Sequence, residues 1–150
     1  MRAWATIAAA VAILAGCGDG ATEQASAPVS SQGALVAYTR SGGIAATTQH
    51  MVVQPDGSAI VRVEGPGNVD ADFKLSDPQL AELKSALGAA TLDGEAEPTG
   101  CADCYTYTIT ADGSTASFDE TQIPPGTQHL VSLLEAIVER ETPTGPARNG

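Results

Sequence analysis

Apolar and polar residues alternate along several short stretches of this chain, and such alternation is typical of β-strands that are buried on one face. The clearest stretch is residues 105–110, in which Tyr105, Tyr107 and Ile109 alternate with threonines. Successive side chains of a strand point to opposite faces of a sheet, so one face of this strand should be buried and the other hydrated. The same pattern predicts further strands at residues 35–40, 59–64 and 115–119, and another within residues 44–54, most clearly at residues 49–54.

Glycine-containing turns separate these strands. The sequence Asp-Gly-Ser occurs at residues 56–58 and again at residues 112–114. Asp-Gly between two strand-like runs favours a tight hairpin, because that turn needs residues that tolerate positive φ. Each Asp-Gly-Ser motif is therefore predicted to join the strands on either side of it. Ser41-Gly42-Gly43 predicts another turn after the first strand.

Two stretches have the spacing of amphipathic helices instead. The first begins at Ser76, where Pro78 suits the first turn and Gln79 completes a capping box, and it is predicted to end at Gly88. The second covers residues 127–141, in which apolar residues recur at helical spacing.

The order of these elements predicts an α+β fold. We expect an antiparallel sheet of about five strands with two helices packed on one face, because a hairpin followed by a helix occurs twice. Residues 34–141 should form a single domain, since this length is enough to bury a core. Residues 65–72 and 89–100 are predicted to be loops, with Phe73 and Leu92 anchoring them to that core.

The start of the chain has the features of an exported, lipid-anchored protein. Residues 4–15 form an apolar run after Arg2, with the length of a secretory signal and too short to span a membrane. This run leads into Leu14-Ala15-Gly16-Cys17, which resembles the lipobox of bacterial lipoproteins. The resemblance implies that residues 1–16 are a signal peptide and that Cys17 carries acyl chains. The alternative is an ordinary signal peptide followed by a chance cysteine.

The stretches on either side of the predicted domain contain little to bury. Residues 17–33 are rich in Gly, Ala, Ser, Thr and Gln and should form the acylated cysteine and a flexible tether. Residues 142–150 contain two prolines and should be a disordered tail. The protein is thus expected on the extracytoplasmic face of a cell membrane, held there by the lipid on Cys17.

The chain is strongly acidic, with a formal net charge of −11 at pH 7. Nucleic-acid-binding surfaces need clustered lysine and arginine, and no such cluster occurs in the sequence. The composition therefore argues against nucleic acid as a partner and against direct docking on an anionic membrane surface. The acidity is expected to serve solubility or the steering of a basic partner.

Cys101 and Cys104 remain as a pair once Cys17 is lipidated. In an oxidising compartment an even pair favours a structural disulfide. A redox pair like that of thioredoxin opens a helix after a strand, whereas this pair precedes a strand. A zinc site needs a second Cys or His pair at suitable spacing, which the sequence lacks. The pair is therefore predicted to be a disulfide that holds the start of the strand at residues 105–110.

No arrangement of residues predicts catalysis, a metal site or a cofactor, so the protein is expected not to be an enzyme. His50 and His129 lack a nearby nucleophile and orienting group in the sequence pattern, so both are expected on the surface of a strand or helix. Glu135 and Glu139 are expected on the wet face of the last helix. The acids of the loops and strand ends could bind Ca²⁺ weakly or meet a cationic partner, but no run of alternating oxygen ligands occurs in the sequence. They are therefore expected to be solvated: Glu95, Glu97, Asp103, Asp119 and Glu120.

One stretch resembles a known family. Residues 36–45, Val-Ala-Tyr-Thr-Arg-Ser-Gly-Gly-Ile-Ala, resemble the opening of emfourin-like proteins, the protealysin-inhibitor family. A leucine-rich helix, a Tyr-Thr-rich strand, an Asp-Gly hairpin, a Pro-Pro break and a final leucine-rich helix follow, so the resemblance spans residues 35–141. The chain departs from the family at residues 44–46, where a bulkier residue and a further glycine are expected. Its lipid anchor and its cysteine pair are additions.

The resemblance implies a small α+β domain that occludes the cleft of a thermolysin-like metallopeptidase. A Gly-Gly turn offers an exposed, close-approaching backbone, so the predicted partner-binding residues are Arg40, Ser41, Gly42, Gly43 and Ile44. The alternative is that the two glycines only make a tight turn.

The sequence thus predicts a membrane-anchored, non-catalytic lipoprotein that binds an extracytoplasmic peptidase or another envelope protein. Inhibition of a metallopeptidase is the function that the resemblance implies. The alternative function is binding of a solute or a cell-envelope component, on the open face of the sheet or in a groove between helices and sheet.

Overall fold

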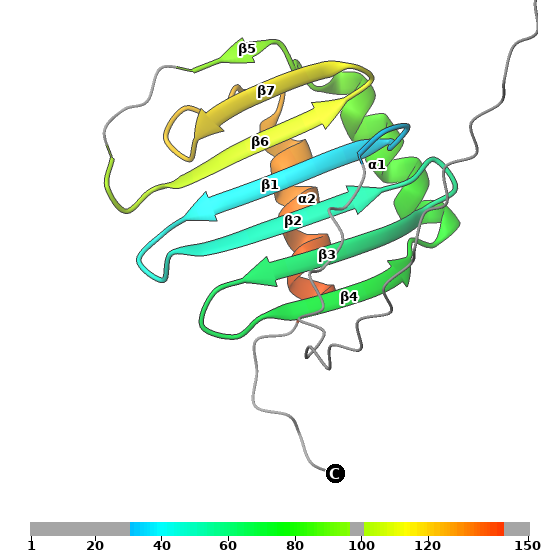
Figure 1. The fold of residues 1–150 in the computed structure, drawn as a ribbon. Coiled ribbons are helices and arrows are strands. Elements are labelled where there is room, and N and C mark those ends of the chain that lie inside the picture. The colour runs from blue at the N-terminus through cyan, green and yellow to red at the C-terminus, as the bar shows by residue number, and fades with distance from the viewer. Residues whose placement is uncertain (1–30, 97–100, 143–150) are drawn as a thin grey trace, which may run out of the picture.

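The computed structural model describes residues 31–96 and 101–142 of the chain. The predicted signal peptide, Cys17, Glu97 and residues 143–150 lie outside the described residues. Along the chain, the elements are β1 (Val36–Gly42), β2 (Thr47–Val53), β3 (Ser58–Glu64), β4 (Val69–Lys74), α1 (Asp77–Ala89), β5 (Gly94–Glu95), β6 (Tyr105–Ala111), β7 (Ser114–Asp119) and α2 (Gln128–Glu141) (Figure 1).

The strands form one sheet in the order β4-β3-β2-β1-β6-β7-β5. Neighbouring strands are antiparallel, except that the two-residue β5 runs parallel to β7. In this register Tyr38 of β1 lies opposite Met51 of β2 and Ile109 of β6. Both helices cover the same face of the sheet and leave the other face open (Figure 1). The predicted α+β class is confirmed.

The sheet has six antiparallel strands instead of about five, because β4 occupies part of the predicted loop 65–72. In β4 the side chains of Val69, Ala71 and Phe73 are partly buried, and the charged residues between them are exposed. Aspartate is unfavourable in strands, so the local sequence argues against a strand here, and pairing with β3 decides the outcome. The short β5 likewise falls in the predicted loop 89–100.

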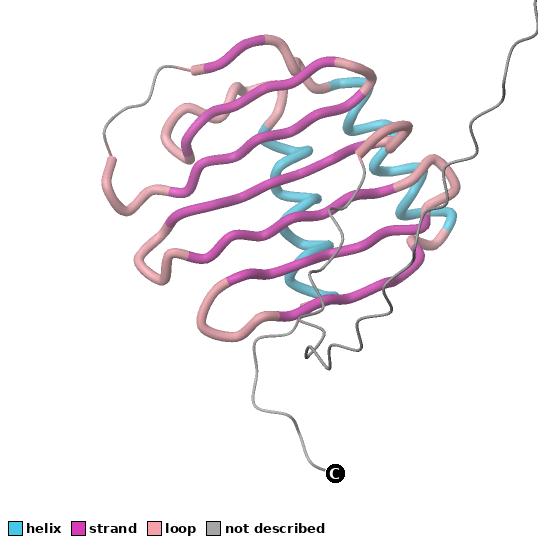
Figure 2. The backbone as a smooth tube through the Cα atoms, viewed as in Figure 1, coloured by secondary structure: helices cyan, strands magenta, loops and turns pink. Residues whose placement is uncertain are grey.

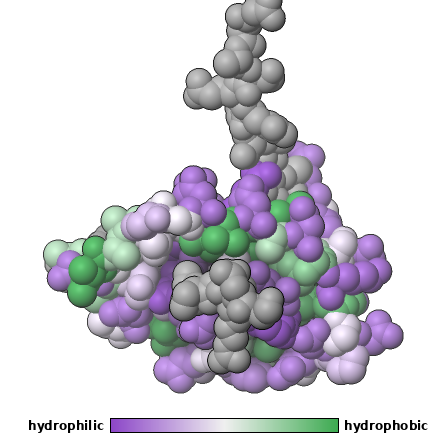
Figure 3. All heavy atoms as spheres, turned by 90° about the horizontal axis from the view of Figure 1, so that it is seen from below, coloured by the Kyte–Doolittle hydropathy of each residue, from purple (hydrophilic) through white to green (hydrophobic). Residues whose placement is uncertain are grey.

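The outer edge of β4 is charged. Asp70, Asp72 and Lys74 are all exposed. Figure 3 views the molecule from below, and most of the coloured residues on this side are hydrophilic. Charged side chains on an edge strand oppose pairing with a further strand, so this edge is protected against association through the backbone.

Both helices begin close to the predicted positions, and the capping box predicted for α1 is present. The side-chain oxygen of Gln79 accepts hydrogen bonds from the backbone N–H of Ser76 at 2.9 Å and from its hydroxyl at 2.8 Å. Before Gln128, the first residue of α2, the buried hydroxyl of Thr127 donates to the carbonyl oxygen of Thr91 at 3.0 Å. Neither helix in the described part of the chain is long and apolar enough to cross a membrane.

The core lies between the sheet and the two helices. Tyr38, Tyr107 and Phe118 form an aromatic row across three strands, with successive ring centroids 6.4 Å and 5.9 Å apart. Leu92 is buried, as predicted. Full burial of a large apolar side chain contributes about 1.5–3 kcal/mol, so this layer is a main source of stability. Large, fully buried side chains come from both sheet and helices: Tyr38, Met51, Leu83, Ile109, Leu130, Leu134 and Ile137.

Three connections gather at one end of the sheet (Figure 2). Gly42, at the end of β1, pairs with Thr47 of β2 and with Tyr105 of β6. A Cβ on Gly65, in the β3–β4 connection, would lie 2.9 Å from the methyl group of Thr47. The β1–β2 turn is therefore flanked by the β3–β4 turn and by the segment that precedes β6. This end of the sheet carries the predicted partner-binding residues and the cysteine pair.

Candidate functional site

The β1–β2 turn places a large apolar side chain in solvent. Residues 43–46 form the turn, in which the N–H of Ala46 donates to the carbonyl oxygen of Gly43 at 3.0 Å. Ile44 is 93 % exposed, and no other large hydrophobic residue is exposed in the part of the chain that the structure describes. The structure therefore presents one apolar side chain at the tip of a tight turn.

Two glycines let this turn lie directly against β6. A Cβ at Gly42 would lie 2.5 Å from the carbonyl oxygen of Cys104, and a Cβ at Gly43 would lie 2.6 Å from the ring of Tyr105. The N–H of Gly43 also donates to the carbonyl oxygen of Cys104 at 3.4 Å. Gly42 and Gly43 have φ values of 109° and 70°, a region that costs a residue with a side chain about 1–2 kcal/mol. The turn thus depends on both glycines.

A Gly43→Ala substitution is expected to destabilise the fold more than Gly113→Ala does. Gly113 has a similar φ of 77° but no atom within 4 Å of the position that a Cβ would take. The Gly113→Ala variant therefore measures only the energetic cost of placing a residue with a side chain at positive φ. We expect a loss of about 1 kcal/mol at Gly113 and of about 2–3 kcal/mol at Gly43, where the methyl group also overlaps Tyr105. Urea denaturation measures both, and equal losses would contradict the close packing of the turn on β6.

A charged network lies beneath the turn, on the side of the sheet that faces the helices. The guanidinium carbon of Arg40 lies 3.6 Å from the ring centroid of Tyr105, a cation–π contact. The Nε atom of Arg40 lies 3.6 Å from Oε1 of Glu135 on α2, and the hydroxyl of Tyr107 donates to the same oxygen at 2.9 Å. Through Arg40, the ring that packs on Gly43 is therefore linked to α2.

Burial raises the pKa values of the tyrosines in this network. Burial and the hydrogen bond to Glu135 raise the pKa of Tyr107 to about 12. Burial also raises the pKa of Tyr38 far above its ordinary value, and the charge of Glu135 acts in the same direction. Both phenols therefore keep their protons at a higher pH than a free tyrosine does, and Tyr107 keeps the proton that it donates to Glu135.

The prediction for Glu135 was wrong, since this residue faces the sheet instead of lying on the wet face of the helix. Its side chain is 32 % exposed and takes part in the network described above. Glu139 is exposed, as predicted. One signal for the network was present in β1, because Arg40 has the same parity as Val36 and Tyr38 and must point to the same face.

Comparison with known protein families identifies the domain. A model of the emfourin family matches residues 57–135, which is more than half of the chain. The chain belongs to the emfourin family. No relative of this emfourin domain is found among curated proteins. The match runs from the β2–β3 turn into α2, so β1, β2 and the turn between them lie outside it.

The emfourin family is a family of inhibitors, which fits a non-catalytic protein. Among the described residues of this emfourin domain, no group of three His, Cys, Asp or Glu could hold a metal ion. His50 Nδ1 lies 3.1 Å from the hydroxyl oxygen of Thr39 on the open face of the sheet. His129 is exposed near the start of α2. Both histidines lie on the surface of their elements, and neither belongs to the β1–β2 turn.

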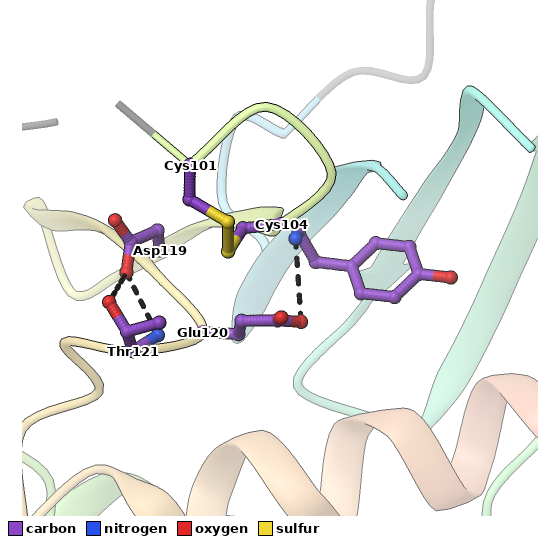
Figure 4. Close-up of a disulfide and its surroundings, with 6 residues drawn as sticks. Cys101, Cys104, Asp119, Glu120 and Thr121 are labelled. Carbon is purple, nitrogen blue, oxygen red and sulfur yellow. Dashed lines mark hydrogen bonds between the residues drawn. A yellow bond between two sulfur atoms is a disulfide. The ribbon is translucent and has the colours of Figure 1, made fainter. Parts of the chain in front are cut away.

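The cysteine pair of the emfourin domain supports the same turn (Figure 4). Cys101 and Cys104 are joined by a disulfide, with their Cα atoms 5.4 Å apart. Directly after Cys104, the N–H of Tyr105 donates to Oε2 of Glu120 at 3.4 Å, and the N–H of Glu120 donates to the carbonyl oxygen of Tyr105 at 3.0 Å. The disulfide therefore closes the loop whose last carbonyl oxygen contacts Gly42 and Gly43.

The predicted loop acids have different surroundings. Asp103 is exposed in the disulfide loop. A carboxylate oxygen of Asp119 accepts hydrogen bonds from the N–H and the hydroxyl of Thr121, at 2.8 Å and 2.6 Å (Figure 4). Asp119 and Glu120 thus order the segment after β7. Glu95 belongs to the short β5.

Replacing both cysteines, in a Cys101→Ser and Cys104→Ser double variant, is expected to lower the free energy of unfolding by at most about 2 kcal/mol. A disulfide that closes so small a loop removes little chain entropy from the unfolded state. Urea denaturation with and without a thiol reductant measures the effect, and the reductant should change the parent but not the double variant. A loss of about 4 kcal/mol or more would mean that the disulfide holds more than its own loop.

The open face of the emfourin sheet is rich in hydroxyl groups. Thr108 lies 3.1 Å from Ser117 and Thr110 lies 2.9 Å from Thr115, each pair measured between side-chain oxygens across β6 and β7. On the neighbouring strands the same face contains a hollow of 650 Å³, whose polar lining includes Thr39, His50, Arg62 and Asp70.

Proposed function

We propose that this chain is an extracytoplasmic lipoprotein that inhibits a thermolysin-like metallopeptidase through the β1–β2 turn. The observation that carries the proposal is the almost complete exposure of Ile44 on a turn that packs against Cys104 and Tyr105. Membership of the emfourin family supports the choice of a peptidase as the partner.

The shape of the turn suits insertion into a cleft. The space beside Gly42 and Gly43 is filled by Cys104 and Tyr105, so the glycine backbone is not the surface that meets a partner. The exposed side chain of Ile44 is the part of the turn that can enter a cleft. An apolar side chain that fills a pocket at the centre of an interface often supplies most of the binding energy. Ile44 has the position and chemistry of such an anchor.

The turn is also ordered before any partner binds. Backbone contacts with Cys104 and the packing of Tyr105 hold it on one side. A preordered loop loses little conformational entropy on binding, which favours high affinity.

The same order opposes cleavage of the turn. Both of its flanking strands are interior strands of the sheet, since β1 pairs with β2 and β6, and β2 pairs with β1 and β3. Residues 43–46 therefore cannot extend without breaking ladders on both sides. A segment that blocks a cleft and resists extension acts as an inhibitor and not as a substrate.

The membrane anchor in this proposal is supported by Leu14-Ala15-Gly16-Cys17 and by the apolar run before it. Two or three acyl chains on Cys17 would hold the protein firmly on a membrane, because each buried CH₂ group contributes about 0.8 kcal/mol. Metabolic labelling with a fatty acid tests the anchor. The parent should carry label, and a Cys17→Ser variant that still carries label would overturn the assignment.

The inhibitory function is tested by titrating the purified full chain against thermolysin-like metallopeptidases with a chromogenic peptide substrate. A chymotrypsin-like serine peptidase is the control. We expect saturable inhibition of the metallopeptidase and none of the serine peptidase. Absence of inhibition at a large molar excess would refute the inhibitory function and leave the anchor untouched.

A second function, binding of a solute or an envelope component, is favoured by the hollow on the open face of the sheet. Its 650 Å³ lies within the range of about 300–1,000 Å³ that is usual for ligand sites, and polar groups from four strands converge on it. Mass spectrometry of the protein purified from membranes under native conditions tests this function. A stoichiometric small molecule that is lost after substitution of Thr39 would support it over inhibition.

A further inference from the structure

We propose that a pocket between α2 and the sheet binds an alkyl-ammonium or alkyl-guanidinium group, as found in lysine and arginine side chains. The pocket has a volume of 310 Å³, at the lower end of the range of about 300–1,000 Å³ for ligand sites. It lies on the helix-covered side of the sheet, away from the hollow on the open face. The inference does not depend on the proposed inhibition.

The floor of the pocket is one row of cross-strand neighbours. Arg40 pairs with Gln49, Gln49 with Val63, and Val63 with Val69, so the row crosses β1, β2, β3 and β4. All four residues line the pocket. The floor is therefore polar at the centre of the sheet and apolar towards its β4 edge.

The roof of the pocket is one face of α2. Glu135, Val138, Glu139 and Thr142 line it, at the spacing of one helical stripe. Thr142, the first residue of the predicted tail, is buried, and its hydroxyl donates to the carbonyl oxygen of Val138 at 2.7 Å. The end of the helix is thus fixed over the pocket.

Gln49 provides a hydrogen-bond acceptor that the protein does not use. Its Oε1 atom is buried and has no hydrogen-bond partner among the described residues. A buried acceptor without a donor costs about 1–3 kcal/mol, which a ligand that carries N–H groups would recover. The Nε atom of Arg40 in the same floor also has no hydrogen bond to any residue that the structure describes, but it lies 3.6 Å from Oε1 of Glu135. The acceptor of Gln49 is therefore the group that a ligand N–H would satisfy.

The charges of the pocket favour a cation. Arg40 is compensated by Glu135, whose Oε1 lies 3.6 Å from its Nε. No ion pair to Glu139 is found in the described part of the chain, so one carboxylate at the rim remains available. An anionic ligand would face two carboxylates, whereas an ammonium or guanidinium head would lie between Glu139 and Gln49.

The remaining walls are apolar and suit an aliphatic stem. Val63 is 8 % exposed and Val138 is 1 % exposed, and both line the pocket together with Val69. Lysine and arginine commonly lay their methylene groups along apolar surface while the charged head reaches polar groups. A short alkyl chain with a cationic head therefore matches both halves of the pocket.

The test is a titration of the ¹⁵N-labelled full chain, followed by nuclear magnetic resonance, with n-butylguanidinium and with n-butylammonium as probes. n-Butylurea, which has the shape of the first probe without its charge, is the control ligand. We expect saturable shifts of the Gln49 side-chain amide and of the backbone amides of Val63 and Val138, with Kd on the order of 1 mM for so small a ligand. No saturable shift with either cation, or an equal response to n-butylurea, would overturn the inference.

Two variants locate the site. Glu139→Gln and Gln49→Leu are each expected to weaken binding about tenfold, because the first removes the negative charge that faces the cationic head and the second removes a hydrogen-bond acceptor. Glu139 is exposed, so its variant should fold like the parent and keeps the test valid if Gln49→Leu does not fold. Glu82→Gln removes an exposed carboxylate of α1 and should bind like the parent. Equal weakening by Glu82→Gln would show a general charge effect and refute the pocket.

Discussion

An Ile44→Asp variant is expected to inhibit a thermolysin-like metallopeptidase at least about 100-fold more weakly than the parent. Loss of a central anchor typically costs about 2–4 kcal/mol of binding energy, and a carboxylate in an apolar pocket adds a desolvation penalty. Because Ile44 is 93 % exposed, the substitution removes no packing from the folded domain, and the free energy of unfolding should stay within about 0.5 kcal/mol of the parent. Inhibition constants and urea denaturation measure the two quantities.

Two further variants test whether weaker inhibition comes from loss of the apolar side chain of the turn or from the added negative charge. Ile44→Leu preserves an apolar side chain and should inhibit within about tenfold of the parent. Ala81→Asp introduces the same charge at an exposed position of α1 and should inhibit like the parent. Parent-like inhibition by Ile44→Asp would remove the turn from the proposed mechanism, and weakening by Ala81→Asp would point to long-range repulsion instead.

A Leu134→Ala variant is expected to lower the free energy of unfolding by about 3–4 kcal/mol. Leu134 is fully buried between α2 and the sheet, so truncation removes apolar contacts and leaves a cavity. This loss is a large fraction of the roughly 5–15 kcal/mol that stabilises a typical domain. Urea denaturation, with far-ultraviolet circular dichroism as the signal, measures it.

Leu133→Ala is the matched control for Leu134→Ala. Leu133 lies next to Leu134 in α2 but is only partly buried against the core. The same chemical change should therefore cost about 1–2 kcal/mol, because fewer contacts are lost and solvent fills the space. A larger loss at Leu133 than at Leu134 would mean that the helix is rotated relative to the structure described above.

The hairpins and helices could be predicted from the sequence because their signals are local. Gly57 and Gly113 both have positive φ, 86° and 77°, as the Asp-Gly turns require. In β6 the alternation of Tyr107 and Ile109 with threonines places the apolar residues in the core. Turn chemistry and alternation each act within a few residues, so no knowledge of the rest of the chain was needed.

Features that depend on distant partners could not be predicted in the same way. β4 forms because β3 offers it a ladder, although Asp70 and Asp72 are unfavourable in strands. β2 begins at Thr47, within the predicted range, and Ile44 lies in the turn despite a residue type that favours strands. In both cases tertiary structure overrides local propensity.

The candidate site likewise has a part that local sequence predicts and a part that depends on distant residues. Residues 40–44 could be singled out from the Gly-Gly pair and from the resemblance to a family. Their surroundings could not, because Cys104, Tyr105 and Glu135 reach the turn only through the pairing of β1 with β6 and the docking of α2. The sequence located the turn, and only the fold shows what supports it.

β1 is the first strand of the chain but takes the middle place in the sheet. A polypeptide emerges from the ribosome or an export channel with its N-terminus first, so β1 must wait for β6 before its second side is filled. Any nascent fragment that stops short of Tyr105 lacks the wall on which Gly43 rests. The full support of the β1–β2 turn is therefore completed only after β6 has been added to the chain.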